Sequence, residues 1–210
     1  GKPYIVKEKN GVKFGIIGIT LPELSEVTLP KNVENVVMLN TDSVITVGIT
    51  ELKDQKCNVI ILLTHCGVDE DVTFADKFYK DVDIIVGGHS HTPLFKPKRE
   101  NGVIIVQAGS YARWLGKLDI KVDVDKDTVV GAYENLVETV MDSSLFDQSA
   151  ANKVADMINA YAPQLKRIIG KLESDWKPSY NAESNMGQFQ ADVFRQKTGS
   201  DAAFMNGGGI

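Results

Sequence analysis

The chain has 210 residues, of which 43% are hydrophobic and 24% are charged. This is enough for one large domain core, or for one core and part of a second. The formal net charge of −5 argues against nucleic-acid binding as the main task, because such proteins usually carry a basic stripe that neutralises phosphates. No apolar run reaches the roughly 18 residues that span a bilayer. We therefore expect no transmembrane segment. Two cysteines, Cys57 and Cys66, are too few for a disulfide framework, so we expect two free thiols.

The first half of the chain alternates apolar runs with helical patterns. Four apolar runs rich in β-branched residues predict buried strands, at 12–19, 58–64, 83–86 and 103–107. Between them, several N-cap candidates followed by helical spacing predict a helix from about 40–43 to about 56, and a short acidic helix is expected over 69–79. This alternation predicts a layered α/β core.

The second half changes character twice. Residues 114–124 and 128–137 alternate polar and apolar side chains, which predicts an antiparallel hairpin and hence a mixed rather than purely parallel sheet. Helical spacing over 147–169 predicts a long connecting helix, which Pro163 would end or kink. A further helix is expected over 185–197. A short strand is expected over 202–205.

Both ends of the chain indicate a piece of a longer polypeptide. The chain opens at Gly1-Lys2-Pro3 without an initiating methionine, and it closes with the flexible run 207–210 (GGGI). We therefore expect an internal fragment.

All three histidines of the chain follow predicted strands. His65 comes directly after the run 58–64, and His89 and His91 follow the run 83–86 in a Gly-Gly-His-Ser-His turn. Ligands collect at the carboxyl ends of strands in open α/β sheets, and neutral imidazole suits Zn, Mn, Fe and Co. The sequence therefore predicts that the three imidazoles bind metal.

Spacing alone leaves the rest of the metal site open. Three imidazoles are enough for a single catalytic zinc. The nearby acids do not complete a larger shell, because Asp69, Glu70 and Asp71 are expected at a helix N-terminus, where the helix dipole favours them. Asp83 begins its strand at the end opposite His89.

Several sequence blocks resemble the calcineurin-like metallophosphoesterases. Residues 60–67 (IILLTHCG) look like the strand-His-x-Gly block of that family, and residues 87–92 (GGHSHT) look like its Gly-His-x-His block. Residues 106–111 (VQAGSY) and 116–119 (GKLD) narrow the resemblance to the branch of 5′-nucleotidases and 2′,3′-cyclic-nucleotide phosphodiesterases.

A second, independent set of blocks resembles the opening of the C-terminal nucleotide-binding domain of that branch. It comprises residues 183–187 (ESNMG), 191–192 (AD), 201–204 (DAAF) and 206–210 (NGGGI). By this resemblance, Asn206, Gly208 and Asn185 are the candidate substrate contacts.

The resemblance implies a fold and a domain plan. The N-terminal domain of the family is a four-layer α/β/β/α sandwich with two mixed sheets, and residues 1–140 would form its C-terminal half. Residues 141–167 would form a linker helix. Residues 168–210 would be the truncated start of a second α/β domain, which binds the substrate.

The resemblance also implies a dinuclear metal centre of two divalent ions such as Zn, Mn or Co. His65 and His89 would bind one ion and His91 the other, and a metal-bound water would attack phosphorus in line with the leaving oxygen. The family's Asp-x-His, Gly-Asp and Gly-Asn-His blocks, which supply the other ligands and the catalytic histidine, do not occur in this chain. No catalytic residue beyond the metal ligands is therefore expected in it.

The activity implied is hydrolysis of nucleotide phosphomonoesters, with 2′,3′-cyclic diesters and nucleoside-diphosphate-type compounds as further candidate substrates. One alternative is a nucleotide- or partner-binding module that has kept the fold and lost turnover. Another is a related hydrolase of sulfur esters. The resemblance further implies an extracytoplasmic location: periplasmic, secreted or at the cell surface.

Overall fold

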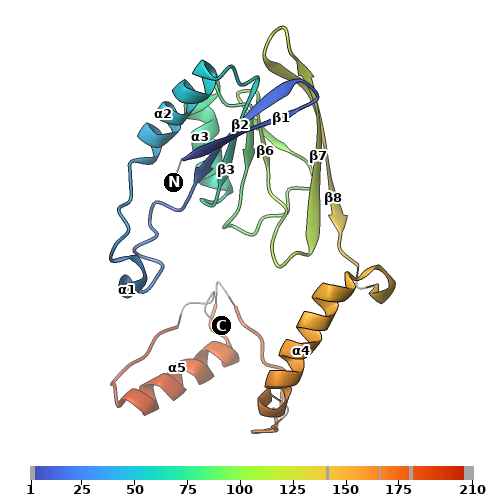
Figure 1. Ribbon diagram of the computed structural model, residues 1–210. Coiled ribbons are helices and arrows are strands. Elements are labelled where there is room, and N and C mark those ends of the chain that lie inside the picture. Colours follow the sequence, from blue (N-terminus) through green and yellow to red (C-terminus); the bar gives the residue numbers. More distant parts are fainter. Residues whose placement is uncertain (1–2, 141, 166, 180–181, 206–210) are drawn as a thin grey trace. The chain divides into compact units, whose positions relative to one another are not determined.

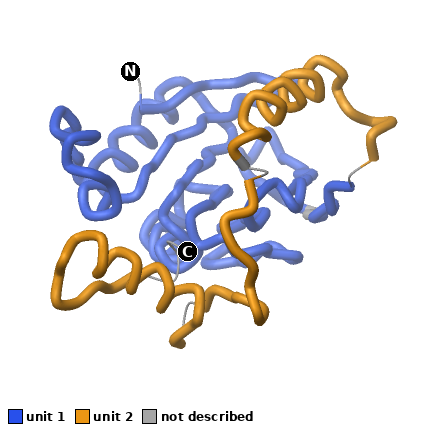
Figure 2. Tube along the Cα trace, turned by 90° about the horizontal axis from the view of Figure 1, so that it is seen from below, with its two compact units in different colours: residues 1–141 blue, residues 142–210 orange. Residues whose placement is uncertain are grey.

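The computed structural model describes residues 3–140, 142–165, 167–179 and 182–205. The chain divides into two compact units, Gly1–Met141 and Asp142–Ile210, which are coloured separately in Figure 2. The predicted assignment of the chain to parts of two domains and a linker stays a prediction.

Unit 1 contains a six-stranded sheet with the strand order β1-β2-β3-β4-β6-β5. Its four inner strands are parallel, namely β2 (Val12–Ile19), β3 (Val59–Thr64), β4 (Ile84–Val86) and β6 (Val103–Val106). Its two edge strands are antiparallel to their neighbours, namely β1 (Tyr4–Lys9) and β5 (Lys98–Glu100). The sheet is therefore mixed, as predicted, but its antiparallel strands are the edges.

The predicted hairpin forms a separate two-stranded sheet. It consists of β7 (Trp114–Asp123) and β8 (Thr128–Glu138), which pair antiparallel with a register shift between Lys121 and Val122. Its apolar residues pack on one face of the main sheet, against a cluster that contains Val59, Ile84, Ile104 and Val106. The hairpin thus forms a second β layer, visible in Figure 1.

Two helices cover the other face of the main sheet (Figure 1). Helix α2 (Thr41–Asp54) lies between β2 and β3 in the chain, and α3 (Val68–Phe78) lies between β3 and β4. Their buried side chains share one core with the strands: Ile17, Ile45, Ile49, Leu52, Leu62, Phe74, Ala75, Ile85 and Ile105. Helices, main sheet and hairpin give an α/β/β order of layers, which confirms the predicted fold class.

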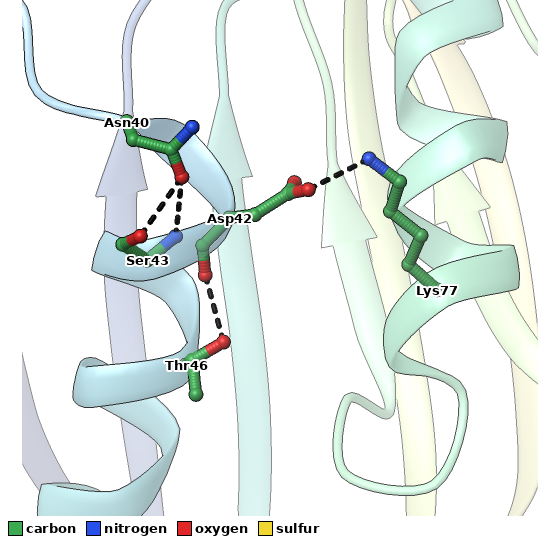
Figure 3. A network of polar contacts seen from close by, with 5 residues as sticks. All are labelled: Asn40, Asp42, Ser43, Thr46 and Lys77. Carbon is green, nitrogen blue, oxygen red and sulfur yellow. Dashed lines mark hydrogen bonds and ion pairs between the residues drawn. The ribbon is translucent and has the colours of Figure 1, made fainter.

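The start of α2 shows why this helix begins where it does (Figure 3). The Asn40 side-chain oxygen accepts hydrogen bonds from the Ser43 backbone N and hydroxyl, both at 2.9 Å. Such an N-cap stabilises a helix by about 1 kcal/mol. Asp42 forms an ion pair with Lys77 of α3 at 2.8 Å, which ties the two helices together at an exposed position. Thr46 donates a hydrogen bond from its hydroxyl to the Asp42 carbonyl at 2.8 Å.

Unit 2 contains the 3-10 turn η1 (Ser143–Leu145) and the helices α4 (Gln148–Leu165) and α5 (Asn185–Thr198). Pro163 lies inside α4, and the helix ends two residues later rather than at 169 as predicted. Helix α5 begins at the Ser184 cap and ends at Gly199, whose φ of 68° is left-handed. None of the described helices is long and apolar enough to cross a membrane.

Two local features differ from what the sequence predicted. Residues 202–205 do not form the expected strand; a β-strand needs a pairing partner, and no described strand pairs with them. The edge strands β1 and β5 and the one-turn helix α1 (Pro30–Val33) were not predicted, because they lack a long apolar run. Both cysteines are free, as expected, and the structure shows that both are buried.

Candidate metal centre

The candidate site lies at the carboxyl ends of two adjacent parallel strands. Strands β3 and β4 are neighbours in register, with Leu63 opposite Val86. His65 directly follows β3, and the loop 87–92 that carries the other two histidines directly follows β4. Strand adjacency therefore brings segments more than twenty residues apart in the chain to one edge of the sheet, where ligands collect in α/β folds.

The structure brings His65 and His89 together. Their ring centres are 5.2 Å apart, and the ring planes are inclined by 69°. Two imidazoles that bind one tetrahedral metal through nitrogens about 2.0–2.1 Å from it have ring centres about 5 Å apart, so this spacing fits a shared ion. The Gly67 amide donates a hydrogen bond to the Gly88 carbonyl at 3.1 Å, which holds the two loops against each other.

Glycine is required where the two loops approach. A Cβ atom on Gly88 would lie 2.9 Å from Nδ1 of His65 and 3.5 Å from the carbonyl oxygen of Thr64. Real Cβ atoms essentially never come within 3.0 Å of another heavy atom, so a side chain at position 88 would displace the His65 ring. The absence of a side chain at Gly88, just before His89, therefore allows the backbone to lie close to the His65 ring.

His91 has a different neighbour. Its ring centre lies 5.5 Å from that of Tyr111, with the planes inclined by 66°. His89, His91 and Tyr111 have φ values of 77°, 56° and 57°, in the left-handed region that is costly for residues with a Cβ. Backbone strain of this kind persists only where the surroundings fix it.

No group of three or more His, Cys, Asp or Glu side chains in the described part of the chain is placed to hold a metal ion. The structure therefore pairs two of the three predicted ligands and places the third against an aromatic ring. Imidazole nitrogens suit ions such as Zn and Fe, and the spacing of His65 and His89 fits such an ion. The roles of His65, His89 and His91 as metal ligands stay predictions.

The nearby acids lie where the sequence placed them, but one has an unexpected environment. Asp69, Glu70 and Asp71 occupy the first turn of α3. Asp71 is fully buried, and its carboxylate accepts a hydrogen bond from the Thr64 hydroxyl at 2.5 Å. Burial raises the pKa of Asp71 to about 6, an effect that the Thr64 hydrogen bond partly offsets. Asp71 thus lies directly behind the strand end that carries His65.

Asp83 lies at the opposite end of the strands and has a structural role. Its carboxylate accepts a hydrogen bond from the Ile60 backbone N at 2.8 Å, and burial raises its pKa to about 6. A cavity of about 510 Å³ opens beside it, lined in part by Cys57 and Asp127. This cavity contains none of the histidines, so it is not the site that the sequence predicted.

Gln107 is a buried polar residue at the site that sequence reasoning did not single out. It directly follows β6 and is 2% exposed. Its side-chain oxygen accepts hydrogen bonds from the Thr92 backbone N at 2.7 Å and the Ser90 hydroxyl at 3.1 Å. Its amide group donates to the Gly88 carbonyl at 3.2 Å. One sequence signal could have identified it: Gln107 is the single polar residue at the end of the apolar run 103–107, and a polar side chain buried there needs a hydrogen-bond partner from another segment.

The predicted substrate contacts fall in unit 2. Asn206 and Gly208 lie outside the described residues. Asn185, the first residue of α5, accepts a hydrogen bond from the Lys177 backbone N at 3.2 Å and donates to the Asp175 carbonyl at 3.0 Å. Its amide therefore anchors the segment before α5, and a contact with substrate stays a prediction.

No protein-family model matches the chain. The chain is 29% identical over 221 residues to the trifunctional nucleotide phosphoesterase YfkN of Bacillus subtilis, which covers 99% of this chain and 15% of that protein. The structure of a 5′-nucleotidase precursor from Thermus thermophilus is similar with a TM-score of 0.78 and 23% identity, covering 93% of this chain and 42% of that one. The sulfate thiohydrolase SoxB from the same organism is similar with a TM-score of 0.75 and 16% identity, covering 94% and 36%.

The chain thus spans well under half the length of these relatives. The two structural similarities, both below 25% identity, establish the fold. The sequence comparisons confirm, over almost the whole chain, the predicted resemblance to nucleotide phosphoesterases and 5′-nucleotidases, which are hydrolases.

Proposed function

We propose that the protein to which this chain belongs is a metal-dependent hydrolase of nucleotide phosphoesters, and that His65, His89 and His91 bind its metal ions. The observation that carries the proposal is the 5.2 Å spacing of the His65 and His89 rings at the carboxyl ends of β3 and β4. The resemblance to nucleotide phosphoesterases supplies the substrate class.

In this proposal the chain's own residues hold and orient the metal site. His65 and His89 would share one ion, and His91, turned by its left-handed backbone toward Tyr111, would bind a second. When bound, two divalent ions supply activation of water and neutralisation of phosphoryl charge. Gly88 permits the close packing of the two histidine loops.

The substrate side of the proposal rests on unit 2. A pocket of about 250 Å³ is lined in part by Glu183, Gln188 and Phe204, in the region that resembles the nucleotide-binding domain. Asn206 and Gly208 follow directly in the sequence and are the proposed substrate contacts, with Asn185 at the start of α5.

The test is phosphate release by the intact protein after its metal has been removed and Mn²⁺, Zn²⁺ or Co²⁺ added back. Substrates would be nucleoside monophosphates, nucleoside diphosphates and 2′,3′-cyclic nucleotides. We expect metal-dependent release that His89→Asn lowers by a factor of roughly 100 or more. Glu8→Gln, at an exposed position on β1, is the control and should retain activity.

The same assay separates the alternatives. Nucleotide binding with no phosphate release, in protein with metal bound, would indicate a binding module without turnover and would overturn the proposal. Hydrolysis of a sulfur ester but of no nucleotide would indicate the other hydrolase class. The similarity to the sulfate thiohydrolase concerns the fold and does not itself favour that reaction.

By the same resemblance we propose that the intact protein lies outside the cytoplasm, in the periplasm, at the cell surface or secreted. Fractionation of the native cells, followed by detection with an antibody against unit 1, tests this. Recovery in the cytosolic fraction alone would contradict it.

A further inference from the structure

The side chain of Gln107 binds every second residue of the loop that carries two of the predicted ligands. Strand β6 is the neighbour of β4, with Val106 opposite Val86, so Gln107 lies beside the start of that loop. Its three hydrogen bonds reach Gly88, Ser90 and Thr92. These residues alternate with His89 and His91, so both histidines are flanked on each side by a residue bound to one amide group.

The amide is packed tightly beneath the loop. A Cβ on Gly87 would lie 3.3 Å from the Gln107 side-chain nitrogen and 3.2 Å from the carboxyl carbon of Asp71. Gly87 also donates a hydrogen bond from its amide to the Val106 carbonyl at 2.8 Å. Gly87, the first residue of the loop, is therefore held against the end of β6, and no side chain at position 87 fits between the loop and Gln107.

These contacts assign Gln107 a supporting rather than a ligating role. Its oxygen already accepts two hydrogen bonds, from Thr92 and Ser90, which occupy both lone pairs. Its nitrogen is a donor and cannot bind a cation. Buried groups that bind the segments carrying metal ligands orient those ligands and tune metal affinity.

We propose that Gln107 is a positioning residue, which holds the left-handed backbone of His89 and His91 in the conformation that binds metal. The inference rests on the proposed function insofar as those histidines bind metal. The loop has unfavourable φ values at both histidines, and such strain needs buried contacts that fix the chain. The three Gln107 hydrogen bonds are such contacts.

Two variants separate the parts of this interaction. Gln107→Glu keeps the acceptor for Thr92 and Ser90 but places an oxygen opposite the Gly88 carbonyl. Gln107→Met removes all three hydrogen bonds at similar volume and leaves the partly buried Thr92 amide without its partner. Gln55→Met is the matched control, because the Gln55 side chain is exposed and binds Tyr4 and Glu51, away from the histidines.

The experiment uses the intact protein and two readouts that do not depend on turnover. Co²⁺ affinity and the Co²⁺ absorption spectrum report ligand geometry, and hydrogen exchange of the peptide containing residues 87–92 reports the metal-free loop. We expect Gln107→Met to weaken Co²⁺ binding roughly 10- to 100-fold and to alter the spectrum. Gln107→Glu should have a smaller effect, and exchange of the loop should accelerate in both variants, with no change in Gln55→Met.

Unchanged Co²⁺ affinity, spectrum and loop exchange in a folded Gln107 variant would overturn the proposal, and so would a wild-type protein that binds no Co²⁺. If Gln107→Met does not fold, Gln107→Glu carries the test. Failure of the proposed function is a separate result, namely absence of nucleotide hydrolysis by wild-type protein. The exchange and Co²⁺ measurements on the variants remain informative in that case.

Discussion

Substitution of Gly88 by alanine tests the geometry of the candidate site at a single atom. The added Cβ would lie 2.9 Å from Nδ1 of His65. Non-bonded heavy atoms prefer separations of about 3.5 Å or more, so the ring or the loop has to move by about 0.5 Å. Metal sites require placement within about 0.5 Å. We therefore expect Gly88→Ala to weaken metal binding roughly 10- to 100-fold, equivalent to about 1.4–2.8 kcal/mol.

The assay is calorimetric titration of the metal-free intact protein with Mn²⁺ or Zn²⁺. Gly18→Ala is the control, because Gly18 lies exposed in β2 of the same sheet and a Cβ there would meet nothing within 4 Å. The control should bind metal like the wild type. Equal affinities for wild type and Gly88→Ala, with both proteins folded, would refute the argument that His65 binds metal in the position described.

Three further predictions concern buried groups of unit 1. Burial raises the pKa of Asp71 to about 6 from its usual 3.8, so its ionisation opposes folding as pH rises. Between pH 4 and 7 the unfolding free energy of the wild type should fall by up to about 3 kcal/mol relative to that of Asp71→Asn. If urea denaturation gave the same pH dependence of the unfolding free energy for both proteins, this prediction would be wrong. Phe74 is 1% exposed, so Phe74→Ala should lower the unfolding free energy by about 3–5 kcal/mol in guanidinium titrations, and a loss below about 1 kcal/mol would refute its place in the core. Burial raises the pKa of the Cys66 thiol to about 11, so alkylation at pH 8 should be far slower in folded than in unfolded protein, and equal rates would argue against a buried thiol.

The inner strands were predictable because strands buried within a sheet leave long, nearly continuous apolar runs. The runs at 12–19 and 58–64 are apolar at almost every position, and each became an inner parallel strand. The hairpin was equally clear from alternation over 114–124 and 128–137. Edge strand β5 has the sequence Lys-Arg-Glu, which carries no such signal and pairs only because β6 offers a free edge.

The proximity of His65 and His89 could be expected from the sequence, because both follow predicted strands. The structure shows that these strands, β3 and β4, are adjacent and parallel. The supporting residues did not follow from it. Gln107 reaches the histidine loop only because β6 lies next to β4, and the burial of Asp71 depends on how α3 packs against Thr64. Contacts of this kind depend on strand order and helix packing, which local patterns do not specify.

Residues 202–205 were predicted to form a strand but do not form one. Of these four residues only Phe204 favours strands, and a strand forms only when another strand pairs with it. The described residues of unit 2 form helices α4 and α5 and the turn η1, and none pairs with residues 202–205. A short apolar run at the end of a sequence is therefore weak evidence for a strand.

The most direct test of the account is an anomalous difference map from crystals of the intact protein soaked in Mn²⁺. We predict a peak within about 2.3 Å of ring nitrogens of both His65 and His89, a bonding distance, and a second peak bonded to His91. A fully occupied Mn²⁺ bound elsewhere, with no peak at any of the three histidines, would contradict it.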